Sequence, residues 1–244
     1  MSEKNQTVFQ DNDKRAKRAI IWRIVPVVYG IVIIIISILL AIFGGFVMAT
    51  AGIEAPGGAA PLFIITLALL VAIIGLVGIS IASLVFYLMW VHRAHQNAEA
   101  MSGEKLFLSA GWNVGFHFIP LANLIIPYLL MLQIAEKSSS EGAKNITLTW
   151  WILILIANGG SFLINLFSFS SSFVSGFSSS YSDSSAYNSP FATSSSLLEL
   201  VGGSIINLIS LAVFVISFFV IHLVNKGQKE RAEEMGLLSK QTQN

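Results

Sequence analysis

The fold is decided by a stretch that reads WVHRAHQN from Trp90 to Asn97 and, after a polar loop, GWNVGFHFIPLANLIIPY from Gly111 to Tyr128. The apolar part, Trp112–Ala135, is long enough to cross a bilayer. Pro120 and Pro127 interrupt it. Each proline lacks an N–H group and presses against the carbonyl four residues earlier, so a straight helix cannot continue. We therefore predict a Pro-broken helical segment here.

The composition is that of a membrane protein. Of the 244 residues, 55% are hydrophobic and only 11% are charged, whereas soluble domains carry about 25% charged residues. The net charge of +1 gives no strong field that would favour nucleic acid, so the partner we expect is the lipid bilayer. The chain contains no cysteine, which excludes disulfides, thiolate metal sites and cysteine nucleophiles.

Four further apolar runs are long enough to cross a membrane, at about residues 22–49, 62–91, 148–169 and 197–224. In lipid the backbone must satisfy its own hydrogen bonds, so each run is predicted to be a helix. The second run carries small residues on one helical face, which is typical of close packing between membrane helices. These residues are Ala68, Ala72, Gly75, Gly78 and Ala82.

The flanking regions are polar. Residues 1–21 form a basic segment and residues 226–244 a tail, both of which we place in the cytoplasm, on either side of a membrane domain at 22–225. Within that domain, residues 168–196 are rich in serine and contain no Lys or Arg. This composition predicts a mobile, low-complexity loop on the extracytoplasmic side.

The basic residues decide between two ways of threading the chain, because Lys and Arg collect on the cytoplasmic side. If Trp112–Ala135 crosses fully, eight of the 14 basic residues lie inside and six outside. If it enters and leaves on the same side, all 14 lie inside. We therefore predict an all-α polytopic protein with four transmembrane helices, one Pro-broken re-entrant or interfacial segment and cytoplasmic termini. This threading also puts all five tryptophans near the cytoplasmic interface.

The pattern Trp90-x-x-Arg93-x-x-x-Asn97, then Trp112 and FIPLANLIIPY at 118–128, resembles the bacterial membrane family known as domain of unknown function 4328. The resemblance covers about residues 60–225 and implies a multi-span protein of the bacterial plasma membrane, without an activity. The family often has a second basic residue and a glycine near Arg93, where this chain has His92 and His95. The serine-rich stretch looks particular to this chain.

Arg93 and Asn97 lie one helical turn apart on the same face. We expect them to hold the Pro-broken segment by bonding to the carbonyls that its prolines leave free. The alternative is a site for lipid head groups or another anionic ligand. The full candidate pocket comprises Trp90, Arg93, Asn97, Trp112, His117, Pro120, Asn123 and Pro127.

Three histidines could take part in proton transfer or metal binding. His117 is either a pH-sensitive switch or, as we favour, a neutral imidazole bonded to a local carbonyl. His92 and His95 are spaced for two metal ligands, but no cysteine or suitable carboxylate completes a set. We predict no metal, no cofactor and no catalytic residues.

The spans contain no Asp, Glu, Lys or Arg in their cores, a group that coupled transporters usually place there. We therefore expect a non-enzymatic membrane component that assembles with itself or with partner membrane proteins. The alternative is a small-molecule or ion conduit built around Pro120, Asn123 and Pro127 with His117. A membrane enzyme is the third possibility.

Overall fold

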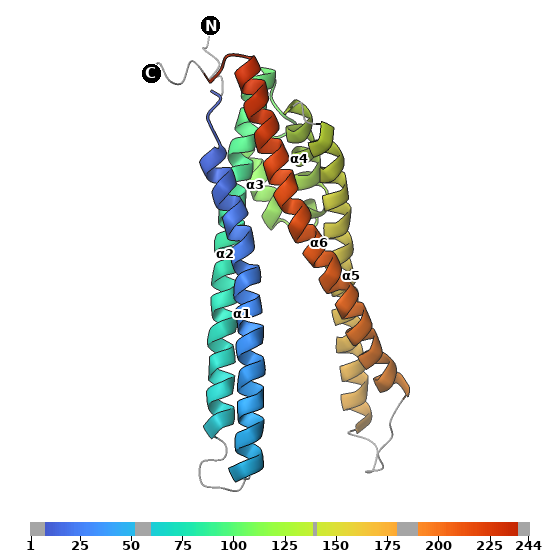
Figure 1. The fold of residues 1–244 in the computed structure, drawn as a ribbon. Coiled ribbons are helices and arrows are strands. Elements are labelled where there is room, and N and C mark those ends of the chain that lie inside the picture. The colour runs from blue at the N-terminus through green and yellow to red at the C-terminus, as the bar shows by residue number, and fades with distance from the viewer. Residues whose placement is uncertain (1–7, 52–59, 139–140, 180–189, 239–244) are drawn as a thin grey trace. The chain divides into compact units, whose positions relative to one another are not determined.

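The computed structural model describes residues 8–51, 60–138, 141–179 and 190–238, and all regular structure in these ranges is helical (Figure 1). The elements are α1 (Asp13–Ala51), α2 (Ala60–Ser102), α3 (Ala110–Gly115), η1 (Phe116–Phe118), η2 (Ala122–Leu124), α4 (Ile126–Lys137), α5 (Glu141–Ser179) and α6 (Pro190–Glu234). Helices α1, α2, α5 and α6 are long and apolar enough to cross a membrane. The predicted fold class is therefore confirmed.

The four long helices extend beyond the predicted spans. They include residues 13–21 of the basic segment, 92–102 of the loop after the second span and 226–234 of the tail. Residues 168–179 and 190–196 are helical too, so the predicted serine-rich loop was too wide. Its centre, 180–189, lies outside the described residues. The physical reason is that a formed helix gains one hydrogen bond for each residue added, so it continues into polar sequence.

The chain divides into two compact units, which we describe separately. Residues 10–94, the hairpin unit, contain α1 and most of α2. Residues 95–244 together with 1–9, the bent-segment unit, contain the end of α2 and all later helices.

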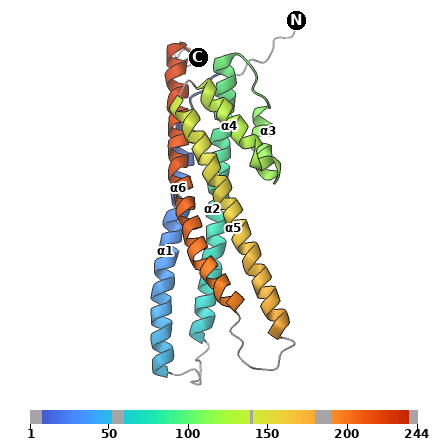
Figure 2. The ribbon, with the colours of Figure 1, turned by 90° about the vertical axis from the view of Figure 1, so that its right-hand side faces the viewer.

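In the hairpin unit α1 and α2 run side by side in opposite directions (Figure 2). Trp22 stacks on Phe86 with ring centroids 5.1 Å apart. One residue further along α1, the Arg23 guanidinium lies 4.5 Å from the centre of the Tyr87 ring. Deeper along the pair, the Tyr29 hydroxyl donates to the carbonyl of Ala72 at 3.2 Å.

The small-residue face predicted on α2 packs against α1 at Gly75. A Cβ atom at Gly75 would collide with the Tyr29 hydroxyl and lie 3.1 Å from the Tyr29 Cζ atom. A Cβ atom at Gly78 would meet no atom within 4 Å. The tyrosine ring therefore requires glycine at the first position but not at the second.

In the bent-segment unit α5 and α6 form a second antiparallel pair. A Cβ atom at Gly142 would lie 3.9 Å from Leu223, near the start of α5 and towards the end of α6. Further along, a Cβ atom at Gly160 would collide with the Ile206 side chain. Helix α4 packs against the first part of α5, where Tyr128 stacks on Trp151.

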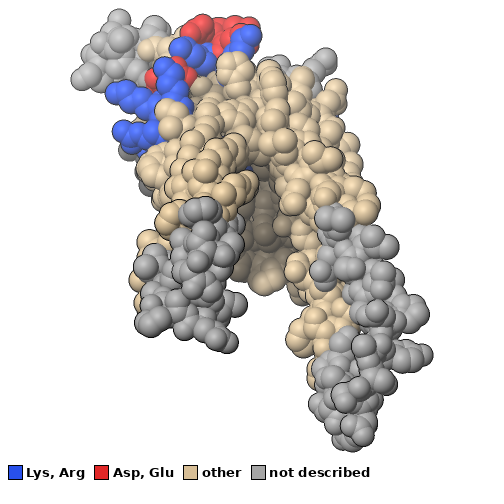
Figure 3. All heavy atoms as spheres, turned by 60° about the horizontal axis from the view of Figure 1, so that its bottom comes forward, with Lys and Arg blue, Asp and Glu red and all other residues tan. Residues whose placement is uncertain are grey.

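Charged side chains gather at helix ends. In the hairpin unit they lie at the start of α1 and at Arg93, and the only charged residue between residues 24 and 92 is Glu54, which is outside the described ranges. In the bent-segment unit the charged side chains that the structure describes lie at the end of α2 and in the loop after it, at the end of α4, the start of α5 and the end of α6, and the side chains of Asp183 and Glu199 are outside the described part. On the face seen in Figure 3, blue and red side chains are grouped together and tan side chains cover the rest of the described residues.

Candidate functional site

The Pro-broken segment is a sharply bent helix pair. Ala110–Phe118 and Ala122–Lys137, which together we call the bent segment, meet at an angle of 108°. Ile119 has the extended conformation (φ −100°, ψ 110°) that a following proline imposes. Pro127 lies in the first turn of α4, where its missing N–H needs no partner. One proline thus marks the end of the first helical piece, and the other lies at the start of α4.

The two ends of the bent segment lie together. The Lys137 ammonium is 2.9 Å from a carboxylate oxygen of Glu104, in the loop that leads into the segment. The backbone N–H of Phe107 donates to the Gln133 side chain at 3.1 Å. A segment that crossed a hydrocarbon core would separate its ends by about 30 Å. The bent segment instead returns to the end from which it starts, as the count of basic residues predicted.

Side-chain bonds from outside the segment hold the bend. Ser109 caps α3 by accepting from the Trp112 N–H at 3.5 Å. At the second helical piece, the indole N–H of Trp151 donates to the carbonyl of Leu124 at 3.1 Å. A carbonyl near Pro127 is therefore satisfied by an indole of α5, and we did not expect this indole in the site.

A buried polar network joins the end of α2 to the start of the bent segment. The Asn113 amide donates to His95 Nδ1 at 3.2 Å, and both side chains are almost fully buried. Because Nδ1 accepts, the proton of a neutral His95 imidazole lies on Nε2. That nitrogen is 3.5 Å from a carboxylate oxygen of Glu99. The same Glu99 oxygen accepts the backbone N–H of Leu106 at 3.2 Å.

His117 continues this network. Its Nδ1 donates to the backbone carbonyl of Asn113 at 2.8 Å, which is the carbonyl bond that we favoured for this imidazole. The network therefore contains a carboxylate, two imidazoles and an amide. Two of its contacts, from Asn113 to His95 and from Leu106 to Glu99, join the end of α2 to the chain that follows it. Among the residues that the structure describes, no group of three or more histidines or carboxylates could hold a metal ion.

The remaining predicted pocket residues are divided between the two units. Trp90 and Arg93 belong to the hairpin unit, where both are buried and the Trp90 carbonyl accepts from the Asn12 side chain at 3.3 Å. Asn97 is buried near the end of α2 in the bent-segment unit, and Asn123 is half-buried in η2. The expectation that Arg93 and Asn97 together hold the bent segment stays a prediction.

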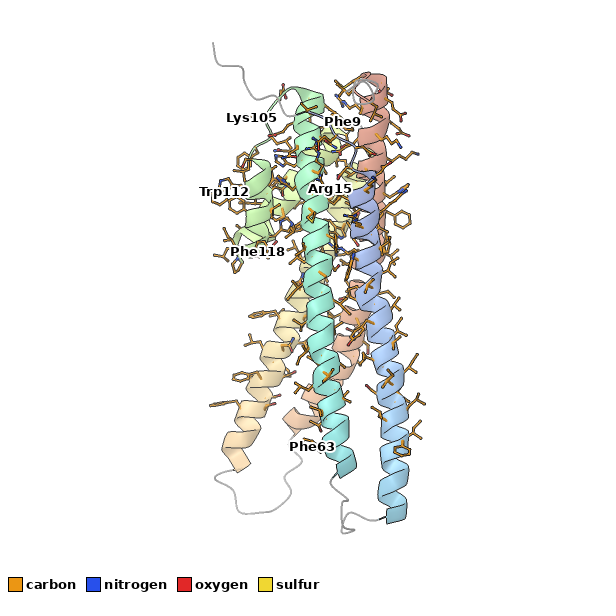
Figure 4. All side chains as sticks on the ribbon, turned by 90° about the vertical axis from the view of Figure 1, so that its left-hand side faces the viewer. Phe9, Arg15, Phe63, Lys105, Trp112 and Phe118 are labelled. Carbon is orange, nitrogen blue, oxygen red and sulfur yellow. The ribbon has the colours of Figure 1, made fainter. Side chains whose placement is uncertain are left out.

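The outer surface of the bent segment is apolar. Leu121, between the two helical pieces, has 82% of its surface exposed. Trp112 and Phe118 are also more than half exposed, and Figure 4 shows both side chains pointing outward from α3 and η1. Pro120 is exposed as well, whereas Pro127 is buried. The segment thus turns polar groups inward and large apolar groups outward.

A family model described as a domain of unknown function (DUF4328) matches residues 63–202, more than half of the chain. The chain belongs to this family. The DUF4328 match runs from α2 into α6 and includes the whole bent segment and the His95–Asn113 network. No curated protein and no solved structure matches the chain.

Several residues that build the site in this DUF4328 protein were not predicted from its sequence. His95 was considered only as a metal ligand beside His92, and Asn113 and Trp151 were not singled out. One signal was present for His95, because Glu99 follows it by four residues and so lies on the same helical face. The pairing of His95 with Asn113 across 18 residues has no comparable signature in the sequence.

Proposed function

We propose that this DUF4328 protein is a non-enzymatic component of the bacterial plasma membrane that assembles with itself or with partner membrane proteins. One observation carries the proposal: the bent segment uses polar groups internally and presents a large apolar surface outward. A conduit built on this segment would need the opposite arrangement, with polar groups facing a water-filled path.

The inward bonds support this reading. The Asn113 side chain donates to His95, and His117 donates to the Asn113 backbone carbonyl. The Leu124 carbonyl accepts from the Trp151 indole. The outward side chain of Leu121 lies near the point where the segment turns back. A re-entrant segment with this surface is suited to lateral contact with lipid or with other membrane helices.

The proposed orientation places both termini in the cytoplasm. The start of α1 and the end of α6 carry most of the basic residues, and basic residues are retained on the cytoplasmic side. In this orientation the bent segment enters the membrane from the cytoplasmic side and returns to it. Its last residue, Lys137, pairs with Glu104 just before its start, so both ends lie on the side that retains the charged residues.

Photo-crosslinking in intact membranes tests the proposal. A photoreactive amino acid would replace Leu121, which is 82% exposed, or the fully buried Leu130 of α4 as a matched control. We expect discrete protein adducts from position 121 and none from position 130. Adducts to lipid alone at position 121 would overturn the assembly proposal.

Flux measurements provide the opposing test. The purified protein would be reconstituted into liposomes that contain pH-sensitive or cation-sensitive dyes. We expect no protein-dependent flux. Flux that is present in the wild type and abolished by Asn123→Leu would establish the conduit instead, because Asn123 is half-buried within the segment that such a conduit would use.

A further inference from the structure

Two asparagines lie in the apolar part of α5, which otherwise reads as a plain membrane span. Asn158 and Asn165 are both exposed and are seven residues apart. Seven residues make almost two helical turns, so the two amides lie on one face about 10 Å apart along the axis. Phe162 and Phe169 share this face and are also exposed. We call these four residues the asparagine face.

The asparagine face points away from α6. Gly160 marks the side of α5 that meets α6, because a Cβ atom there would collide with Ile206. At 100° for each residue, Asn158 lies about 160° and Asn165 about 140° around the helix from Gly160. Packing between α5 and α6 therefore does not explain why amides occupy these positions.

Each amide is only partly used within its own helix. Asn158 Nδ2 donates to the carbonyl of Ile154 at 2.9 Å, and Asn165 Nδ2 donates to the carbonyl of Ser161 at 2.7 Å. An asparagine amide has two N–H donors and an oxygen that accepts two bonds. Each side chain thus retains one N–H and its oxygen for an external partner. An amide oxygen without a donor is costly in hydrocarbon.

We propose that two copies of this chain associate through the asparagine face of α5. An amide is both donor and acceptor, so it is complementary to an identical amide. All copies insert in the same orientation, which makes a symmetric pair of α5 helices parallel and brings each asparagine opposite its equivalent in the second copy. Hydrogen bonds between such side chains and close apolar packing are what associate membrane helices.

A second copy of α5 fits the face better than other helices of this chain. The described parts of α1 contain no Asn or Gln, and α2 has them only at Gln96 and Asn97 near its end. The apolar part of α6 carries a single such residue, Asn207. Only α5 presents two amides with the matching seven-residue spacing.

Disulfide trapping in native membranes tests this inference, which rests on the proposed assembly function. Because the chain has no cysteine, one substitution gives one reporter. Phe162→Cys lies on the asparagine face, between the two amides. Leu163→Cys is the matched control: it is adjacent and equally exposed (64% against 66% for Phe162), but about 100° around the helix. We expect an oxidant to trap a dimer from Phe162→Cys and little from Leu163→Cys.

Replacing the amides gives the decisive comparison. In the Phe162→Cys background, Asn158→Leu with Asn165→Leu should lower the trapped fraction about fivefold or more. Equal trapping at positions 162 and 163, or trapping that the leucine substitutions leave unchanged, would overturn the inference. Full-length yield and a monodisperse elution profile would confirm that the double variant folds.

Other occupants of the face give distinct results. A disulfide within one chain between Phe162→Cys and Ser80→Cys, a residue exposed on α2, would show that the hairpin unit covers the face and would reject self-association. If α5 yields no dimer but position 121 still yields protein adducts, the inference fails while the proposed assembly function stands. If position 121 also yields only lipid adducts, both fail.

Discussion

The Lys137 side chain, at the end of the bent segment, lies 2.9 Å from that of Glu104, which precedes the segment's start. Both side chains are partly or largely exposed, so the ion pair itself stabilises the fold little. The ion pair is informative about geometry, because it shows that the start and the end of the segment lie side by side. Together with the bond from Phe107 to Gln133, it shows a segment that turns back.

Cysteine labelling in intact cells should confirm this path in the membrane. We expect Glu136→Cys, at an exposed position near the end of α4, to be protected from a membrane-impermeant maleimide and to label after permeabilisation. Ser2→Cys and Ser180→Cys serve as the inside and outside controls. Labelling of position 136 in intact cells would mean that the segment crosses the membrane.

The pair also makes a prediction about pH. The hydrogen bond from Lys137 and its positive charge lower the pKa of Glu104 below its ordinary value of 4.5. A lowered pKa in the folded state contributes stability above pH 4.5, and that contribution is lost as the pH falls through the lowered pKa. Lys137→Gln should therefore reduce thermal stability slightly at pH 6, and this reduction should shrink as the pH falls below 4.5. A deficit of the variant that did not shrink as the pH fell would show that Lys137 acts other than through Glu104.

The buried bond between His95 and Asn113 should contribute more to stability. His95→Leu or Asn113→Leu leaves the other polar group buried without its partner, which costs about 1–3 kcal/mol. Unfolding in detergent measures both variants and the double variant. We expect the double variant to lose less than the sum of the single losses, because the bond can be lost only once. Asn145→Leu, at an exposed site on α5, is the control and should change little.

The contact between Gly75 and Tyr29 predicts a strong contrast between neighbouring glycines. Gly75→Ala should destabilise the protein by about 1–3 kcal/mol, because the added methyl group collides with the tyrosine. Gly78→Ala should be neutral or slightly stabilising, because no atom lies within 4 Å and alanine favours helix. Thermal unfolding in detergent compares the two. Tyr29→Leu should relieve most of the Gly75→Ala loss; equal losses at both glycines would contradict the tyrosine contact.

The sequence predicted the features that follow from composition and from proline. Apolar runs located the four long helices, and Pro120 and Pro127 located the bend. Both signals are local: a run of about 20 apolar residues is a span, and a proline breaks the helix that contains it. The distribution of basic residues predicted that the bent segment turns back, because the number of Lys and Arg on each side of the membrane depends on the path of the whole chain.

The contacts that hold the bend could not be predicted, because they join residues distant in sequence. Trp151 donates to Leu124 across 27 residues. We expected this tryptophan, like the other four, near the membrane interface. That expectation did not predict that Trp90, Trp150 and Trp151 are buried within the protein. An indole suits an interface and a buried hydrogen bond equally well, so residue type alone does not distinguish them.

The gathering of charged side chains at helix ends has a consequence for how the chain enters the bilayer. The stretch from Ile24 to Val91, which includes the residues that connect α1 to α2, contains no Lys or Arg. The same is true of the stretch from Asn145 to Asn225, which covers most of α5 and α6 and their connection. Translocating a basic residue is what the membrane resists most. Each helical pair can therefore insert as a hairpin from the side that keeps its charged ends, without carrying a single basic side chain across.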